Sequence, residues 1–139
     1  MPDNVFVDTN IVVYAHDKTA GAKHITARNI ILDLWENKRG CLSIQVMQEF
    51  YVAVTQKVAK PMDYTTATRI IRDLSFWQVH EPKARDIINA IDLQQRYRIS
   101  FWDAMIITSA VQLGCSMIWS EDLNHGQVYE GVKLLNPFL

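Results

Sequence analysis

The stretch VFVDTNIVVYAH, residues 5–16, decides how the chain is organised. It is apolar and β-branched on both sides of Asp8, a composition typical of a strand that is buried on both faces of a sheet. An ionised carboxylate in such surroundings is costly unless a charge or a hydrogen-bond donor meets it. Residues 5–7 therefore predict a central strand, and Asp8 needs a partner that compensates its charge.

Short apolar runs alternate with helical patterns along the rest of the chain. The runs that predict strands are VFV (5–7), CLSI (41–44), FWQV (76–79), MIWS (117–120) and VKLL (132–135). Apolar residues recur at helical spacing in the segments 24–40, 63–74, 81–97 and 104–114. We therefore expect a single domain over residues 1–139, with an α/β fold: a three-layer α/β/α sandwich around a central parallel sheet of four to five strands.

Two of the helical segments have apolar patterns that predict how much of each helix is buried. In 81–97, the residues at helical spacing are Ala84, Ile87, Ile88 and Ile91, which we expect to form the buried stripe. The segment 104–114 is apolar nearly all round and ends at Gly114, which predicts a buried helix.

The composition indicates a folded globular protein of the cytoplasm. Of the 139 residues, 49% are hydrophobic and 21% are charged, and no apolar run is long enough to span a membrane. The start, MPDNVFVD, does not resemble a secretion signal. Cys41 and Cys115 lie beside apolar runs without metal-like spacing, which predicts reduced thiols in the core.

The net charge of −1 argues against a broadly basic nucleic-acid-binding surface. It does not exclude nucleic acid, because charge can be segregated. If four of the 15 acidic residues lay in one site and were neutralised there, the 14 Lys and Arg residues would make the rest of the surface net positive.

Four acidic residues fall where strands end or helices begin. Asp8 directly follows the first strand, and Asp122 follows the fourth by two residues. Glu49 lies about one turn into the helix expected after residue 44, and Asp103 lies in the first turn of the buried helix. In an open parallel sheet these positions share the carboxyl edge, where ligands bind.

Each acid also has a purely structural explanation. Asp8 fits a turn or a helix cap, Asp103 fits the S-x-x-D capping pattern, and Asp122 lies in a polar turn. The helical period places Glu49 with Gln45 on a face that we expect to be solvated.

Together, the four acids favour a metal site. Carboxylates that converge on one edge repel one another, and their pKa values rise. A hard divalent cation relieves this repulsion, and carboxylates with water are the ligands that Mg²⁺ and Mn²⁺ prefer. We therefore predict that Asp8 meets a divalent cation.

The motifs V-D-T-N (7–10), F-W-D-A-M-I (101–106) and W-S-E-D-L (119–123), with an acid in the helix after the second strand, resemble the PIN domain. The chain length and the order of these motifs are similar to those of the VapC toxins of prokaryotic toxin–antitoxin pairs. The resemblance implies a site of six residues: the metal-binding and catalytic acids Asp8, Glu49, Asp103 and Asp122, and the supporting polar residues Asn10 and Ser120.

The resemblance also implies an activity and partners. The activity is Mg²⁺- or Mn²⁺-dependent endonucleolytic cleavage of RNA, and the partners are an RNA substrate, a VapB-type antitoxin and a second copy of the chain. No membrane is expected among the partners.

Other functions remain open at this stage. A non-catalytic PIN-like scaffold that binds RNA or protein would share the fold. A phosphatase of the haloacid-dehalogenase type also has Asp after its first strand, but it needs a second Asp where this chain has Asn10. A response-regulator receiver needs Asp after the third strand, and FWQVHEPK offers none.

Several aromatic and basic residues are interpreted structurally. Trp102 could stack on a nucleobase, but its position predicts a core residue. The four histidines, at positions 16, 24, 80 and 125, show no metal-ligand spacing and are expected mostly at the surface. Basic clusters at 18–28, 38–39 and 96–98 are expected on solvated helix faces, from which they could still meet phosphates.

Overall fold

The computed structural model describes residues 3–139, whose strands form one six-stranded sheet in the order β3-β2-β1-β4-β6-β5. The strands are β1 (Val5–Val7), β2 (Gly40–Ser43), β3 (Gln78–His80), β4 (Met117–Trp119), β5 (Val128–Tyr129) and β6 (Val132–Leu135). Neighbouring strands are parallel except for β5, which runs antiparallel to β6. The sheet is therefore mixed and mostly parallel.

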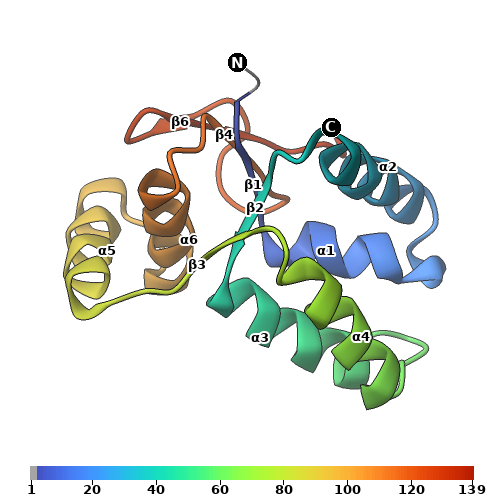
Figure 1. Cartoon of the computed structure of the whole chain (residues 1–139). Coiled ribbons are helices and arrows are strands. Elements are labelled where there is room, and N and C mark those ends of the chain that lie inside the picture. The colour runs from blue at the N-terminus through green and yellow to red at the C-terminus, as the bar shows by residue number, and fades with distance from the viewer. Residues whose placement is uncertain (1–2) are drawn as a thin grey trace.

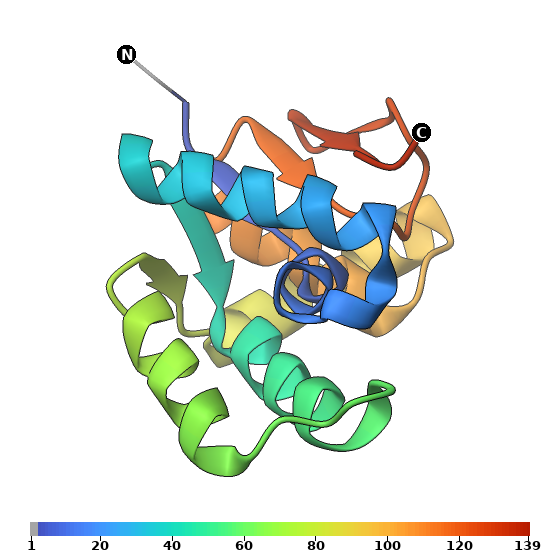
Figure 2. The same cartoon turned by 90° about the vertical axis from the view of Figure 1, so that its right-hand side faces the viewer.

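Helices cover both faces of the sheet, so the predicted three-layer α/β/α arrangement is confirmed. The α-helices are α1 (Thr9–His16), α2 (Ala22–Asn37), α3 (Ile44–Val52), α4 (Tyr64–Leu74), α5 (Ala84–Tyr97) and α6 (Phe101–Gln112), joined by a 3₁₀ turn at Lys18–Ala20 and a π-helical turn at Ala53–Lys57. α5 and α6 lie on one side of the strands, and α1 and α2 lie on the other (Figure 1). In the view turned by 90°, α1 and α2 lie in front of the sheet (Figure 2).

The strand-like composition of residues 5–16 continues past the strand itself, which ends at Val7. The Asp8 backbone N–H still donates to the carbonyl of Trp119 (3.0 Å), and its side chain then accepts from Thr9 N (2.7 Å) and begins α1. Ile11 and Val12 are fully buried in this helix. Their burial outweighs the modest helix propensity of β-branched residues, so the second half of the stretch is helical.

The sheet has one strand more than the four to five that were predicted. β5 is only two residues long and is joined to β6 by Glu130 and Gly131, which both have positive φ (51° and 82°). Two such residues make the tight turn that suits a β-hairpin. The hairpin was not predicted, because Glu-Gly is not one of the usual dipeptides for that turn.

The third strand starts later than predicted, at Gln78 rather than Phe76. Phe76 lies in the turn after α4 and is 82% exposed.

The helix α6 is buried along Ala104–Ala110, as its all-round apolar pattern predicts. It packs on β2, β4 and β6, so the start of α6 is fixed against the sheet.

The prediction of which face of α5 is buried is wrong. Ile87, Ile88 and Ile91 are 44%, 66% and 43% exposed, whereas Ala90 and Leu93 face the core. α5 packs mainly against α6 rather than on the sheet. The isoleucines of α5 therefore form an apolar surface.

Among residues 3–139, none of the helices combines the length and the apolar composition that a bilayer crossing requires.

Candidate active site

The pairing of β1 with β4 brings the first acid and Ser120 together. The strands are parallel with Val7 opposite Trp119, so the next residue of each strand lies at the same edge of the sheet. Ser120 Oγ donates to Asp8 Oδ2 (2.7 Å), and both residues are buried. The edge at which they meet is the carboxyl edge, where open parallel sheets bind ligands.

Burial raises the pKa of Asp8 to about 7. The hydrogen bonds from Ser120 and Thr9 favour the ionised form and oppose this rise, while the nearby carboxylates of Asp122 and Asp103 add to it. Asp8 is only 5% exposed, so water does not stabilise its charge. Two hydrogen bonds are therefore not enough to keep this carboxylate ionised well below neutral pH.

Asn10 connects the start of α1 to the loop after β4. Its Nδ2 donates to Asp122 Oδ2 (3.1 Å), and its Oδ1 accepts from the backbone N–H of Glu121 (3.1 Å). Ser120 Oγ also accepts from Asp122 N (3.0 Å). Asn10 and Ser120 thus hold the loop on which Asp122 lies.

The neighbouring acid Glu121 is turned toward a different set of partners. Tyr14 Oη donates to Glu121 Oε1 (2.7 Å), and Lys23 forms an ion pair with the same carboxylate. These contacts keep the pKa of Glu121 below its ordinary value, although its partial burial opposes them. Glu121 is therefore neutralised by its own partners, and Asp122 faces the other acids.

Glu49 is held over the same edge by two residues that sequence analysis did not select. Thr9 Oγ1 and Gln45 Nε2 both donate to Glu49 Oε1, each at 3.1 Å. Gln45 Nε2 also donates to the carbonyl of Trp102 (3.3 Å), which ties α3 to the start of α6. Gln45 is 8% exposed, so the expectation that its helix face is solvated is wrong there.

Asp103 lies in the first turn of α6. Its backbone N–H donates to Ser100 Oγ (3.0 Å), so the predicted S-x-x-D cap is present. Its pKa is raised, mainly by burial and further by Asp122 and Glu49, against the lowering effect of the Ser100 hydrogen bond. A capping role for its backbone thus leaves the carboxylate available to the site.

All four predicted acids, Asp8, Glu49, Asp103 and Asp122, line one open cleft of about 310 Å³. A space of this size holds several water molecules, each of which occupies roughly 30 Å³. Within residues 3–139, however, no three Asp, Glu, His or Cys side chains stand close enough as arranged to hold a metal ion. The structure brings the acids to one cleft, and their metal-binding and catalytic roles stay predictions.

Trp102 and His80 differ from their predicted environments. Trp102, expected in the core, is 62% exposed and lies at the same cleft. His80, expected at the surface, is 9% exposed and contacts Ser109 and Asp86. Cys41 and Cys115 are buried free thiols, as predicted.

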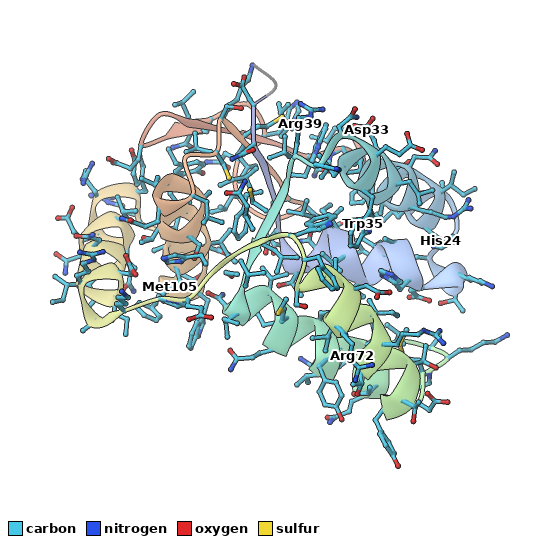
Figure 3. All side chains as sticks on the ribbon, viewed as in Figure 1. His24, Asp33, Trp35, Arg39, Arg72 and Met105 are labelled. Atoms are coloured by element: carbon cyan, nitrogen blue, oxygen red, sulfur yellow. The ribbon has the colours of Figure 1, made fainter. Side chains whose placement is uncertain are left out.

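Several of the basic residues are engaged in ion pairs. Lys23 pairs with Glu121, Arg39 with Asp33, and Arg96 with two acids. Figure 3 shows Asp33 and Arg39 near the amino end of β2. The acids of the cleft lie at the opposite, carboxyl edge of the parallel strands. The positive charge of these basic residues is therefore partly neutralised, and that of Arg39 lies far from the acids.

Two solved structures of similar fold are both connected with toxins. VapC20 of Mycobacterium tuberculosis, described as a toxin that cleaves the sarcin–ricin loop, has a TM-score of 0.67 and 23% sequence identity, over 86% of this chain and 90% of VapC20. A chain of a toxin–antitoxin complex from Klebsiella pneumoniae has a TM-score of 0.68 and 20% identity, over 96% of this chain and 98% of that one. At these identities the likenesses establish the fold.

No curated protein matches the sequence at a significant level. The family model of the PIN domain matches residues 5–131, which is most of the chain. The predicted resemblance is therefore confirmed, and this chain belongs to the PIN domain family.

Proposed function

We propose that the protein is a divalent-metal-dependent endoribonuclease that hydrolyses phosphodiester bonds in RNA, and that it acts as the VapC-type toxin of a toxin–antitoxin pair. The observation that carries the proposal is the cleft lined by Asp8, Glu49, Asp103 and Asp122, which come from four distant parts of the chain. PIN-domain membership and the fold shared with VapC20 support RNA as the substrate class.

The chemistry of the cleft fits Mg²⁺ or Mn²⁺. Apart from the Tyr14 phenol, its ionisable groups are carboxylates, which are hard oxygen donors, and burial with two neighbouring acids raises the pKa of Asp8. A bound cation would favour the ionised form of Asp8 and so offset the cost of burying its charge. Asp8 and Asp103 would be the direct ligands, while Glu49 and Asp122, whose side chains are exposed, would hold a water or a second ion.

When bound, a divalent cation supplies a water of lowered pKa and offsets the negative charge that develops on the phosphodiester. The chain's own residues orient the acids. Ser120 fixes the Asp8 carboxylate, Asn10 fixes that of Asp122, and Gln45 with Thr9 fixes that of Glu49. Such supporting hydrogen bonds keep the metal-binding carboxylate oxygens in place, so less reorganisation is needed during the reaction.

Protein partners follow from the same proposal. We infer an antitoxin as the regulator, because a structural relative is part of a toxin–antitoxin complex, and we infer a homodimer in the cytosol. The exposed Ile87, Ile88 and Ile91 of α5 support a protein contact, since apolar surfaces of this kind are commonly covered by a partner. Sedimentation velocity of the isolated chain distinguishes a dimer from a monomer.

The test is cleavage of single-stranded RNA by the purified protein. We expect cleavage with Mg²⁺ or Mn²⁺, none in excess EDTA, and a large loss of cleavage with Asp8→Asn or Asp103→Asn. Asp73→Asn is the matched control, because Asp73 is exposed on α4 outside the cleft. A folded protein that binds RNA but does not cleave it with any divalent metal would identify a non-catalytic scaffold. Cleavage in EDTA would also contradict the proposal.

The phosphatase alternative receives no support. Position 10 carries Asn, and its side chain is engaged with Asp122 and the backbone of Glu121. It therefore cannot supply the second carboxylate that this chemistry requires.

A further inference from the structure

Trp102 is a large aromatic side chain that lies in water beside the acids. It is 62% exposed, directly precedes Asp103, and lines the same cleft as the four carboxylates. Burial of an indole is strongly favourable, so an indole left in solvent at this position is a surface on which a ligand can gain binding energy. This side chain has no part in the proposed metal site.

The backbone that carries Trp102 is fixed. Its carbonyl accepts from Gln45 Nε2 (3.3 Å), and its ring packs edge-on against Phe101, with centroids 5.1 Å apart and planes at 73°. Ser100 caps the helix at the same point. Little conformational entropy is therefore lost when a ligand meets the indole.

Gln45 provides this fixation at a cost. Its Oε1 is buried and has no hydrogen-bond partner among residues 3–139. An unpartnered buried acceptor is destabilising, and such groups in folded proteins call for an explanation. Here the amide is oriented so that its nitrogen donates to both Glu49 and the Trp102 carbonyl, which places the indole and the carboxylates in one fixed frame.

The negative charge of the cleft favours a mode of binding that does not depend on charge. Four carboxylates repel a phosphate backbone, and the Lys23 ammonium is already paired with Glu121. Stacking of a base on an aromatic ring does not depend on the charge of the backbone and is tolerant of base identity. It is available only to a nucleotide that is unpaired.

We propose that Trp102 is a stacking platform for one unpaired nucleobase next to the scissile phosphodiester, held in position by Gln45. This inference rests on the proposed function and names the substrate more closely, as single-stranded or looped RNA. A rigid duplex cannot place a base on the indole without unpairing it.

The test measures RNA binding apart from cleavage. Fluorescence anisotropy of a labelled oligoribonucleotide that the wild type cleaves gives dissociation constants for the Asp8→Asn protein, alone and combined with Trp102→Ala, Trp102→Phe or Phe76→Ala. Phe76 is the matched control, an aromatic residue 82% exposed outside the cleft. We expect Trp102→Ala to weaken binding about 10-fold, Trp102→Phe to restore most of it, and Phe76→Ala to change nothing.

The same oligoribonucleotide with an abasic residue at each position in turn identifies the stacked base. We expect one abasic position to weaken binding of the Asp8→Asn protein as much as Trp102→Ala does, with no further loss when the two changes are combined. Independent, additive losses at every position would overturn the inference. On the active background, we expect Trp102→Ala to raise KM with little change in kcat.

The outcomes separate this inference from the function on which it rests. If the wild type cleaves RNA and Trp102→Ala binds as tightly as Phe76→Ala, the platform is refuted and the nuclease stands. If the wild type neither binds nor cleaves RNA, the proposed function fails and the platform with it. If Trp102→Ala changes the sedimentation coefficient instead of RNA affinity, the indole belongs to a protein interface and the inference is overturned.

Discussion

Two buried polar clusters of this protein differ in whether they can balance their own charge. At the end of β3, His80 lies between Ser109 Oγ, 2.8 Å from its Nδ1, and Asp86 Oδ2, 3.2 Å from its Nε2. At the end of β1, Asp8 meets a hydroxyl and a backbone N–H, and its charged neighbours are other acids. The first cluster pairs an acid with a base, and the second gathers acids alone.

The difference separates a structural cluster from a candidate site. The cluster around His80 joins β3, α5 and α6, and the Lys83 N–H also donates to Asp86 Oδ2 (2.8 Å). Asp86 Oδ1 has no partner within the described part of the chain, and the cluster is buried in the interior. The cluster around Asp8 opens into a cleft, so a cation from solvent can complete it.

The same isosteric change should reduce activity in the cluster around Asp8 and leave activity unchanged in the cluster around His80. We expect Asp8→Asn to reduce metal-dependent RNA cleavage by about 100- to 1,000-fold, because a charge that binds the cation is lost. Asn still offers an acceptor to Thr9 N, so the fold should persist. Asp86→Asn should cleave at the wild-type rate while folded. Initial cleavage rates, with circular dichroism as the folding control, check both expectations, and equal rates for the two variants would contradict the comparison.

The metal-free protein should lose stability as pH rises from about 4 to about 7. The pKa of Asp8 is raised from 3.8 to about 7 in the folded state, so the native protein binds a proton that the unfolded chain has released. The penalty is absent below the unfolded-state pKa and reaches on the order of 4 kcal/mol above the folded-state pKa.

Urea unfolding in EDTA at pH 5 and pH 8, with Asp8→Asn for reference, measures this difference. We expect the variant to gain stability relative to the wild type at the higher pH. A pH-independent difference between the two proteins would show that the Asp8 carboxylate is not penalised by its surroundings.

Addition of Mn²⁺ should stabilise the acidic cluster and leave the other unaffected. A ligand that binds only the folded state at 100 times its dissociation constant adds about 2.7 kcal/mol to the free energy of unfolding. We expect the melting temperature of the wild type and of Asp86→Asn to rise with Mn²⁺, and that of Asp8→Asn to rise much less. An unchanged wild-type melting temperature in millimolar Mn²⁺ would argue against a shared cation.

The smallest effect is expected for Asp86→Asn, on the free energy of unfolding. Asp86→Asn removes the negative charge that strengthens the hydrogen bonds to Oδ2, and it puts an amide NH2 at the buried position where Oδ1 has no partner among the described residues, so we expect a loss of about 1–3 kcal/mol. Urea denaturation midpoints at constant m-value check it. A neutral substitution would mean that this cluster does not stabilise the packing of α5 against α6.

The sheet and the positions of the acids were accessible from the sequence because both depend on short-range patterns. A buried strand followed by Asp8, and a fourth strand followed by Asp122, place those residues at one edge whatever the details of packing. The two-residue strand β5 was not accessible, since its turn uses Glu130 rather than a typical turn former.

Other features depend on how helices cross and could not be derived from one-dimensional patterns. Gln45 and Glu49 lie on a polar face of α3, and only the contact with α6 makes that face part of the cleft. Trp102 begins a helix that is apolar all round, so no periodicity indicates which of its residues face water. The exposed isoleucines of α5 escaped prediction for a related reason, because the pattern does not say which apolar face meets α6.

The most direct test of the account is anomalous diffraction at the manganese edge from crystals of the wild-type protein grown or soaked in Mn²⁺. We expect an anomalous peak in the cleft within coordination distance of the Asp8 and Asp103 carboxylates, and no such peak in Asp8→Asn crystals. A wild-type cleft without manganese, in protein that cleaves RNA under the same conditions, would contradict the claim that these acids act through a shared cation.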